Sequence, residues 1–257
     1  MRDPEVCLKE LCVTTTVDEK YEAYIPLFIY CFNKAYPEHD LKIYYRGDIS
    51  PHFEKYCAVG ENVVEGFGLT LENNIATTPS IRFLVPQVDF EDYRYTLFTD
   101  IDILFRREPN GIVAPHLKAM EKNHLECYEN IMLKTIRGPS MPGVHFVTRE
   151  WWPDTAQTRV QYWQDLYENP NIANYKGFDE YMLYNMHLDS NLPLPNIGHD
   201  SWRLHGIHLG AYRNKNSNPP ISTVDNEFLR ELWADHDFVE LYNICRFRNK
   251  IVYLPKP

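Results

Sequence analysis

The 257-residue sequence lacks several patterns that would assign it to a class directly. Its six cysteines include no Cys-x-x-Cys pair, which argues against a zinc site or a disulfide framework and favours reduced thiols in the core. No apolar run approaches the length of a membrane-spanning helix, and the first residues lack the basic and apolar regions of a signal peptide. We therefore expect a cytoplasmic protein without a transmembrane segment.

Positive charge is also scarce. The chain carries 26 Lys and Arg against 36 Asp and Glu, for a formal net charge of −10 at pH 7. A protein that coats nucleic acid or an anionic membrane would favour a basic surface, so we expect no nucleic-acid partner. A nucleotide is still compatible with this charge, because a metal ion and a few local donors suffice for a diphosphate.

Apolar residues are abundant enough for a sizeable core, at 44% hydrophobic and 14% aromatic. No internal repeat and no clear linker interrupt the chain. We expect one domain over residues 1–257, with a core at about 10–213 and a variable C-terminal portion at 214–257. Four tryptophans could form a sugar-stacking surface, but burial in the core is the commoner fate of such residues: Trp151, Trp152, Trp163 and Trp202.

Hydrophobic periodicity predicts alternating strands and helices. Strands are expected at 10–16, 41–45, 95–99, 143–148 and 202–210, the last with its following loop. Helices are expected at 18–36, 50–57, 80–87 and 179–188, with Asp18 and Asp179 as N-caps. Residues 60–78 appear irregular, and 213–220 form a candidate mobile segment. This order predicts an α/β fold with a Rossmann-like, mostly parallel mixed sheet flanked by helices. Such a sheet binds ligands at the carboxyl ends of its strands, here around Thr15 to Asp18.

The stretch YRYTLFTDIDILFRRE, residues 93–108, places Asp100 and Asp102 inside an apolar run. Ionised carboxylates in such a setting are costly unless a cation or hydrogen bonds compensate them. Magnesium and manganese take oxygen ligands and often share them with phosphates. The motif alone fits two solvated loop acids equally well. The apolar residues on both sides, which place the pair at a strand end, favour the metal site.

Two histidines, His205 and His208, lie in the later stretch RLHGIHLGAYR. A neutral imidazole is a suitable third ligand for manganese, and the sequence leaves open which of the two supplies it. We favour His208 because Gly210 and Arg213 follow it closely. Glycine allows close approach of the backbone to a phosphate, and the fork of an arginine suits phosphate oxygens.

Three further charged residues are candidates for the same site. Arg82 precedes the strand with the carboxylate pair, so it could pair with Asp100 or contact a ligand. Asp179 and Glu180 open a predicted helix, where capping and the helix dipole already favour acids. Two adjacent acids also suit sugar hydroxyl recognition and acid–base or nucleophilic work.

In their order along the chain, these segments resemble the nucleotide-sugar glycosyltransferases of the GT-A fold. They look most like the glycogenin and lipopolysaccharide galactosyltransferase group, glycosyltransferase family eight. The segment CVTTTVDEKYEAYIPLFIYCFNKAYPEHDLKIYY resembles the family's first strand, nucleotide-binding turn and helix, and YTLFTDIDILF resembles its metal-binding strand. IRFLVPQ, PGVHFVT, GFDEYMLY and LHGIHLGAYR stand at the places of four other family motifs. The likeness spans roughly residues 10 to 213.

The resemblance implies a role for each candidate. Metal binding, to Mn²⁺ or Mg²⁺, is implied for Asp100, Asp102 and His208. Donor binding is implied for Thr14, Thr15, Thr16, Tyr21, Arg82, Asp100, Gly210 and Arg213. Asp179 and Glu180 are implied as catalytic residues near the anomeric carbon. Glu180 stands where the family usually has Gln, and the Asn-Ala-Gly of another motif is missing, so a neighbouring family of the same fold also fits.

The implied function is a metal-dependent glycosyltransferase that moves a hexosyl or pentosyl group from a nucleotide diphosphate sugar to a glycan or other hydroxyl acceptor. A UDP-sugar donor and a retaining mechanism are favoured, and the acceptor is expected on the C-terminal portion. An aspartyl-nucleophile phosphohydrolase is one alternative, although such enzymes usually carry Asp-x-Asp on their first strand. A non-catalytic nucleotide- or carbohydrate-binding module is another. The intact Asp-x-Asp and His208 favour the enzyme.

Overall fold

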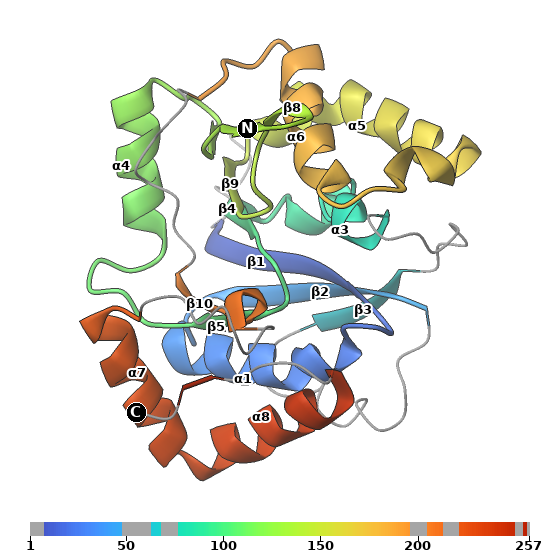
Figure 1. Ribbon diagram of the computed structural model, residues 1–257. Helices are drawn as coiled ribbons and strands as arrows, with labels where there is room; N and C mark the ends of the chain where they lie inside the picture. Colours follow the sequence, from blue (N-terminus) through green and yellow to red (C-terminus); the bar gives the residue numbers. More distant parts are fainter. Residues whose placement is uncertain are drawn as a thin grey trace, which may run out of the picture.

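A computed structural model of the protein describes residues 8–47, 63–67, 77–195, 205–212, 221–249 and 254–255 (Figure 1). The strands are β1 (Lys9–Asp18), β2 (Asp40–Arg46), β3 (Val63–Phe67), β4 (Tyr93–Phe98), β5 (Ile103–Phe105), β6 (Tyr128–Glu129), β7 (Leu133–Thr135), β8 (Gly138–Ser140), β9 (His145–Thr148) and β10 (Gly206–His208). Six of them form the central sheet, in the order β3-β2-β1-β4-β9-β6. The pairs β5–β10 and β7–β8 form two separate ribbons.

The central sheet is mixed, as predicted. β1 pairs in parallel with β2 and β4, and β2 pairs in parallel with β3. β9 runs antiparallel to both β4 and β6. The α/β class and the mixed sheet flanked by helices are therefore confirmed. Because β1 and β4 are parallel neighbours, their carboxyl ends meet at one edge of the sheet.

Helices cover both faces of the sheet. They are α1 (Ile25–Ala35), α3 (Thr77–Ile81), α4 (Val113–Asn123), α5 (Trp151–Glu168), α6 (Phe178–Asp189), α7 (Thr223–Ala234) and α8 (His236–Asn249). In Figure 1, α1 and α8 lie below the sheet, and α3, α5 and α6 lie above it. Among the described residues, no helix combines the length and apolar character needed to cross a membrane.

The core is rich in aromatic residues. α1 buries one apolar face, and the rings of Phe28 and Phe32 pack against Phe105 with centroid separations of 5.4 and 5.3 Å. On the other side of the sheet, Trp151 and Trp152 are buried, and Trp152 stacks on Phe90 at 4.7 Å. Burial of each such side chain contributes about 1.5–3 kcal/mol. Trp151 and Trp152 therefore belong to the core rather than to a sugar-stacking surface. Trp163 is partly buried, and Trp202 lies outside the described residues.

Both predicted N-caps are wrong. Asp18 is the last residue of β1, and α1 begins only at Ile25, with Pro26 in its first turn. α6 is capped by Gly177, whose φ of 81° lies in the left-handed region that glycine tolerates. Asp179 instead sits in the first turn, and its carboxylate bonds to a side chain from another segment.

Two predicted segments differ from the structure. The irregular region 60–78 contains β3 and the start of α3. The helix expected at 80–87 ends at Ile81, and the following residues form turns. There the backbone carbonyls of Phe83 and Val85 accept hydrogen bonds from the buried guanidinium of Arg159, a tertiary contact that replaces further helical bonding. The predictions for 50–57, 202–204 and 213–220 lie outside the described residues.

Candidate functional site

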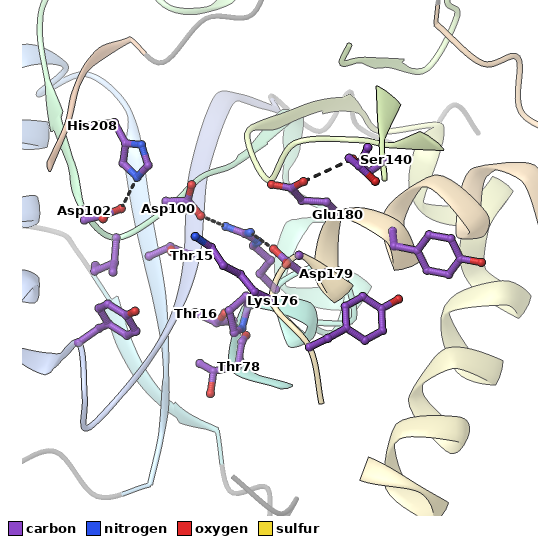
Figure 2. Close-up of a pocket in the computed structure, with 18 of the residues that line it drawn as sticks. Thr15, Thr16, Thr78, Asp100, Asp102, Ser140, Lys176, Asp179, Glu180 and His208 are labelled. Carbon is purple, nitrogen blue, oxygen red and sulfur yellow. Dashed lines mark hydrogen bonds and ion pairs between the residues drawn. The ribbon is translucent and has the colours of Figure 1, made fainter. Parts of the chain in front are cut away.

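A pocket of about 750 Å³ opens where β1 and β4 end (Figure 2). Its lining includes most of the predicted site residues: Thr15, Thr16, Tyr21, Arg82, Asp100, Asp102, Asp179, Glu180 and His208. Thr14 is fully buried within β1 and does not line the pocket. Gly210 lies directly behind His208, and Arg213 lies outside the described residues. Of the described part of the chain, neither α7 nor α8 reaches the pocket, so the structure gives no support to an acceptor site there.

The β1 side of the pocket carries hydroxyl groups. Thr16 Oγ1 donates to the backbone oxygen of Thr78 at 2.6 Å, and the Thr78 hydroxyl donates to Asp18 Oδ2 at 3.1 Å. The hydroxyl of Thr15 is buried without a hydrogen-bond partner in the described part of the protein. This side of the pocket is therefore polar.

The β5–β10 ribbon brings Asp102 and His208 together. The strands run antiparallel with His208 opposite Ile103, and the Leu209 amide donates to the Asp102 carbonyl at 2.7 Å. Only glycine fits at position 206, since a Cβ there would lie 1.8 Å from the Leu104 carbonyl oxygen. This close pairing sets His208 Nε2 at 3.1 Å from Asp102 Oδ1.

Asp100, Asp102 and His208 form a set of donors that suits a divalent cation. One ligand atom from each lies within 4.8 Å of the others. A Cβ at Gly210 would lie 2.7 Å from His208 Nε2 and 3.1 Å from Asp102 Oδ2. The φ of Gly210 is not in the left-handed region, so a larger residue here is disfavoured by contact with His208 and Asp102 rather than by backbone conformation. Two carboxylates and one imidazole fit manganese or magnesium.

Arg82 joins the two sides of the pocket. Its guanidinium ion-pairs with Asp100 and donates from Nη2 to Asp179 Oδ2 at 2.6 Å (Figure 2). Burial lowers the pKa of Arg82, but the two carboxylates outweigh burial and raise the pKa overall. Gly143 leaves room for this arrangement, since a Cβ there would lie 2.1 Å from Nη2. The positive charge of Arg82 therefore compensates part of the negative charge of Asp100. This pairing is one of the possibilities predicted from the sequence.

Glu180 is the acid on the α6 side with the greater access to a ligand. Asp179 is buried and bound to Arg82, whereas Glu180 is partly exposed and its carboxylate accepts a hydrogen bond from the Ser140 hydroxyl at 3.4 Å. Burial raises the pKa of Glu180, and the neighbouring Asp179 charge raises it further. A carboxylate with a raised pKa is a better proton acceptor, which suits a group that works on a substrate hydroxyl.

Residues around the β7–β8 ribbon were not predicted as part of the site. The ribbon is tied to α6 by a hydrogen bond from the Met141 amide to the Glu180 carbonyl at 3.0 Å. It contributes Thr135, Ile136, Arg137 and Ser140 to the pocket, and the segment before α6 adds Tyr175 and Lys176. Strands of three residues carry too little periodicity to be recognised in a sequence.

His205 belongs to a different cluster. Its Nδ1 lies 2.8 Å from Glu108 Oε1, and its Nε2 lies 2.7 Å from His116 Nε2. His116 Nδ1 in turn lies 2.8 Å from Glu129 Oε2. Both imidazoles are buried, so each ring nitrogen is used within a closed chain of hydrogen bonds. The geometry therefore groups His208, and not His205, with the two aspartates.

No family model matches the sequence, and no curated protein sequence matches it. Solved structures similar to the chain include the glycosyltransferase GlyE of Streptococcus pneumoniae TIGR4, at 16% identity and TM-score 0.45, over 71% of this chain and 44% of that one. This chain therefore matches less than half of the length of GlyE. The galactosyltransferase LgtC, solved with donor and acceptor sugar analogues, matches at 13% identity and TM-score 0.40, over 95% and 98% of the two chains.

A third similar structure is that of an enzyme with a different activity. The 4-diphosphocytidyl-2C-methyl-D-erythritol synthase of Anaerococcus prevotii DSM 20548 matches at 9% identity and TM-score 0.47, over 88% and 99% of the two chains. GlyE and LgtC belong to the class that the sequence motifs resemble. At these identities the likenesses concern the fold alone, and at TM-scores below 0.5 they do not bear on the chemistry of the site.

Proposed function

We propose that the protein is a metal-dependent glycosyltransferase that moves a sugar from a nucleotide diphosphate sugar, in the simplest case a UDP-sugar, to a glycan or other hydroxyl acceptor. The observation that carries the proposal is the Asp100–Asp102–His208 set, in which one ligand atom from each residue lies within 4.8 Å of the others. The set borders a pocket large enough for a nucleotide sugar, with Glu180 on its other side.

The donor is assigned to the β1 side of the pocket. Thr15, Thr16 and Tyr21 line that side, where their hydroxyls suit the ribose and base of a nucleotide. Arg82 holds Asp100 and Asp179 in fixed positions and so acts as a positioning residue. The roles of Thr14, Gly210 and Arg213 toward the donor rest on the family resemblance.

A divalent cation held by Asp100, Asp102 and His208 would supply positive charge that stabilises the departing diphosphate. The protein's own groups handle the sugar and the proton. As the bond from the anomeric carbon to the diphosphate oxygen breaks, positive charge develops on the sugar ring, and the Glu180 carboxylate stabilises it. In the retaining route that we favour, the acceptor hydroxyl passes its proton to the leaving diphosphate oxygen. In an inverting route Glu180 would instead remove that proton as general base.

One observation disfavours the phosphohydrolase alternative. An aspartyl nucleophile needs a carboxylate free for in-line attack, whereas Asp100 is ion-paired with the buried guanidinium of Arg82. A binding module without turnover would share the whole site, and only a measurement of catalysis separates it from an enzyme.

Donor turnover tests the proposal. Purified protein is incubated with Mn²⁺ and a panel of nucleotide sugars, and NMR follows the released nucleoside diphosphate and the anomeric configuration of the first-formed sugar product. We expect slow, metal-dependent release with retention of configuration for one donor. Asp102→Asn should abolish the release, and the exposed Asp92→Asn should not change it. Nucleotide binding without any release would identify a binding module, and release without metal would contradict the proposal.

A further inference from the structure

Four cationic side chains line the pocket, and they differ in what they contact: Lys20, Arg82, Arg137 and Lys176. Arg82 is neutralised by two carboxylates. Arg137 stacks on the Tyr175 ring at 4.2 Å, and the Lys20 ammonium lies 5.0 Å from the Tyr21 ring centroid. Within the described ranges, Lys176 is the one of the four whose ammonium makes no hydrogen bond, ion pair or ring contact.

The backbone of Lys176 is well anchored, although its ammonium has no polar contact with any residue that the structure describes. Arg137 Nη1 donates to the Lys176 carbonyl at 3.1 Å, and Gly177, the next residue, caps α6. Figure 2 shows the Lys176 side chain pointing into the pocket, toward the side that carries Asp100. An exposed lysine needs no partner, but a lysine anchored at its backbone and directed into a ligand pocket is placed to meet a ligand.

We propose that Lys176 binds the diphosphate of the nucleotide sugar from the side opposite the Asp100–Asp102–His208 set. The inference rests on the proposed function and adds a residue that the sequence motifs do not contain. Lys176 would act as a point charge on the phosphate oxygens, in the manner of lysines in other phosphate sites.

Charge balance explains why a second cation is needed. When the glycosidic bond breaks, its electron pair stays on the diphosphate oxygen, and the diphosphate gains one negative charge. Arg82 offers little to this charge, because Asp100 and Asp179 already hold its guanidinium. The Lys176 ammonium would therefore attract the diphosphate more strongly as the bond breaks than in the bound donor. An interaction that is stronger in the transition state than in the ground state is what accelerates a reaction.

Lys176 could also meet an anionic group on an acceptor, since phosphate and carboxylate present the same chemistry to an ammonium. The two sources are separated by binding a nucleoside diphosphate alone, with no acceptor present. The inference requires that Lys176 contributes to that binding.

Isothermal titration calorimetry provides the test, with Mn²⁺ and a panel of nucleoside diphosphates (UDP, GDP, CDP and ADP) and with the matching nucleoside. For the diphosphate that wild type binds most tightly, we expect Lys176→Met to weaken binding about tenfold or more, the scale of a lost charge-assisted hydrogen bond. Lys176→Arg should retain most of the affinity. Lys134→Met, an exposed residue of β7 outside the pocket, removes the same charge and should bind like wild type.

Binding of Mn²⁺ alone and of the nucleoside should be unchanged in Lys176→Met, which shows that the fold and the metal ligands are intact. If Lys176→Met binds the diphosphate as tightly as wild type, the inference is overturned while the proposed function stands. If Lys134→Met weakens binding equally, the effect is one of net charge and the inference is also wrong. If wild type binds no nucleoside diphosphate with Mn²⁺, the proposed function and the inference both fail.

Discussion

His205 immediately precedes β10 and His208 ends it, and the surroundings of the two histidines are opposite. His205 is buried in a closed chain with Glu108, His116 and Glu129, in which every imidazole nitrogen has a partner. The His208 side chain is 31% exposed, and its Nε2 lies 3.1 Å from Asp102 Oδ1 at the edge of the pocket. The same kinds of side chain therefore serve stability at one end of the strand and, in our proposal, metal binding at the other.

The difference shows what separates a structural cluster from a ligand site. A buried polar cluster is stable when its members satisfy one another, and then it has no capacity for a ligand. The Asp100–Asp102–His208 set brings together two carboxylates, and although Asp100 ion-pairs with Arg82, a bound divalent cation would relieve their remaining repulsion. Three predictions test this contrast.

The largest effect is expected at His205. His205→Ala should lower the free energy of unfolding by about 3 kcal/mol, because it removes the hydrogen bonds that the buried His205 makes to the partly buried Glu108 and to the buried His116. Urea denaturation measures the change. His236→Ala, at a side chain that is 90% exposed, is the control and should stay within about 0.5 kcal/mol of wild type. Equal stability of His205→Ala and wild type would show that the closed chain contributes nothing.

The opposite result is expected at His208. His208→Ala should weaken Mn²⁺ binding about a hundredfold, because it removes one of three ligands, while the urea midpoint stays close to that of wild type. Titration calorimetry with Mn²⁺ provides the measurement. Unchanged metal affinity in His208→Ala would show that His208 is not a metal ligand. A fall in stability as large as that of His205→Ala would show that the two histidines do not differ in their structural role.

A smaller effect is expected at Gly210. Gly210→Ala places a methyl group against His208 Nε2 and Asp102 Oδ2, and we expect Mn²⁺ affinity to fall about tenfold. The neighbouring Ala211 is exposed, so Ala211→Gly makes the reverse change away from His208 and Asp102 and serves as the control. Metal affinity in Gly210→Ala equal to that of wild type would mean that metal binding does not depend on the observed positions of His208 and Asp102.

The smallest effect on stability concerns Glu180 and depends on pH. Since the pKa of Glu180 is raised in the folded protein, ionising it costs folding free energy. This cost is absent below the unfolded pKa of about 4.3 and develops as the pH rises through the folded pKa. Glu180→Gln should therefore unfold at a higher temperature than wild type at pH 7, and at the same temperature as wild type near pH 4. A gain that persisted unchanged at pH 4 would contradict the assignment.

The same variant separates the two mechanisms. If the route is retaining, Glu180→Gln should lower the rate of sugar transfer only about tenfold, because the amide oxygen still stabilises the developing charge. Loss of a general base would cost about 10²–10⁴-fold. Initial rates of nucleoside diphosphate release, with the anomeric configuration of the product determined by NMR, distinguish these outcomes.

Residues with strong local patterns were predictable from the sequence. The buried run of β1 and the alternation of β1, α1 and β2 were predicted, and so was the carboxylate pair at the end of β4. The sequence also allowed for the pairing of Arg82 with Asp100, because an unpaired charge in an apolar segment needs a partner, and the structure contains this ion pair.

The remaining features depend on contacts between distant segments. The helix expected at 80–87 is cut short by hydrogen bonds from Arg159, which lies more than seventy residues away in the chain. The choice between His205 and His208 depends on the register of β5 with β10 and on His116 from α4. The pocket wall of β7 and β8 consists of strands of three residues, too short for periodicity to reveal.

The central claim is that Asp102 helps to hold a divalent cation that the nucleotide requires. Titration calorimetry of wild type, Asp102→Ala and Asp92→Ala with a panel of nucleotide sugars, with and without Mn²⁺, tests it most directly. We predict that wild type and Asp92→Ala bind one nucleotide sugar only when Mn²⁺ is present, and that Asp102→Ala loses about a hundredfold or more in affinity. Binding that is the same with and without Mn²⁺, or the same in Asp102→Ala as in wild type, would contradict it.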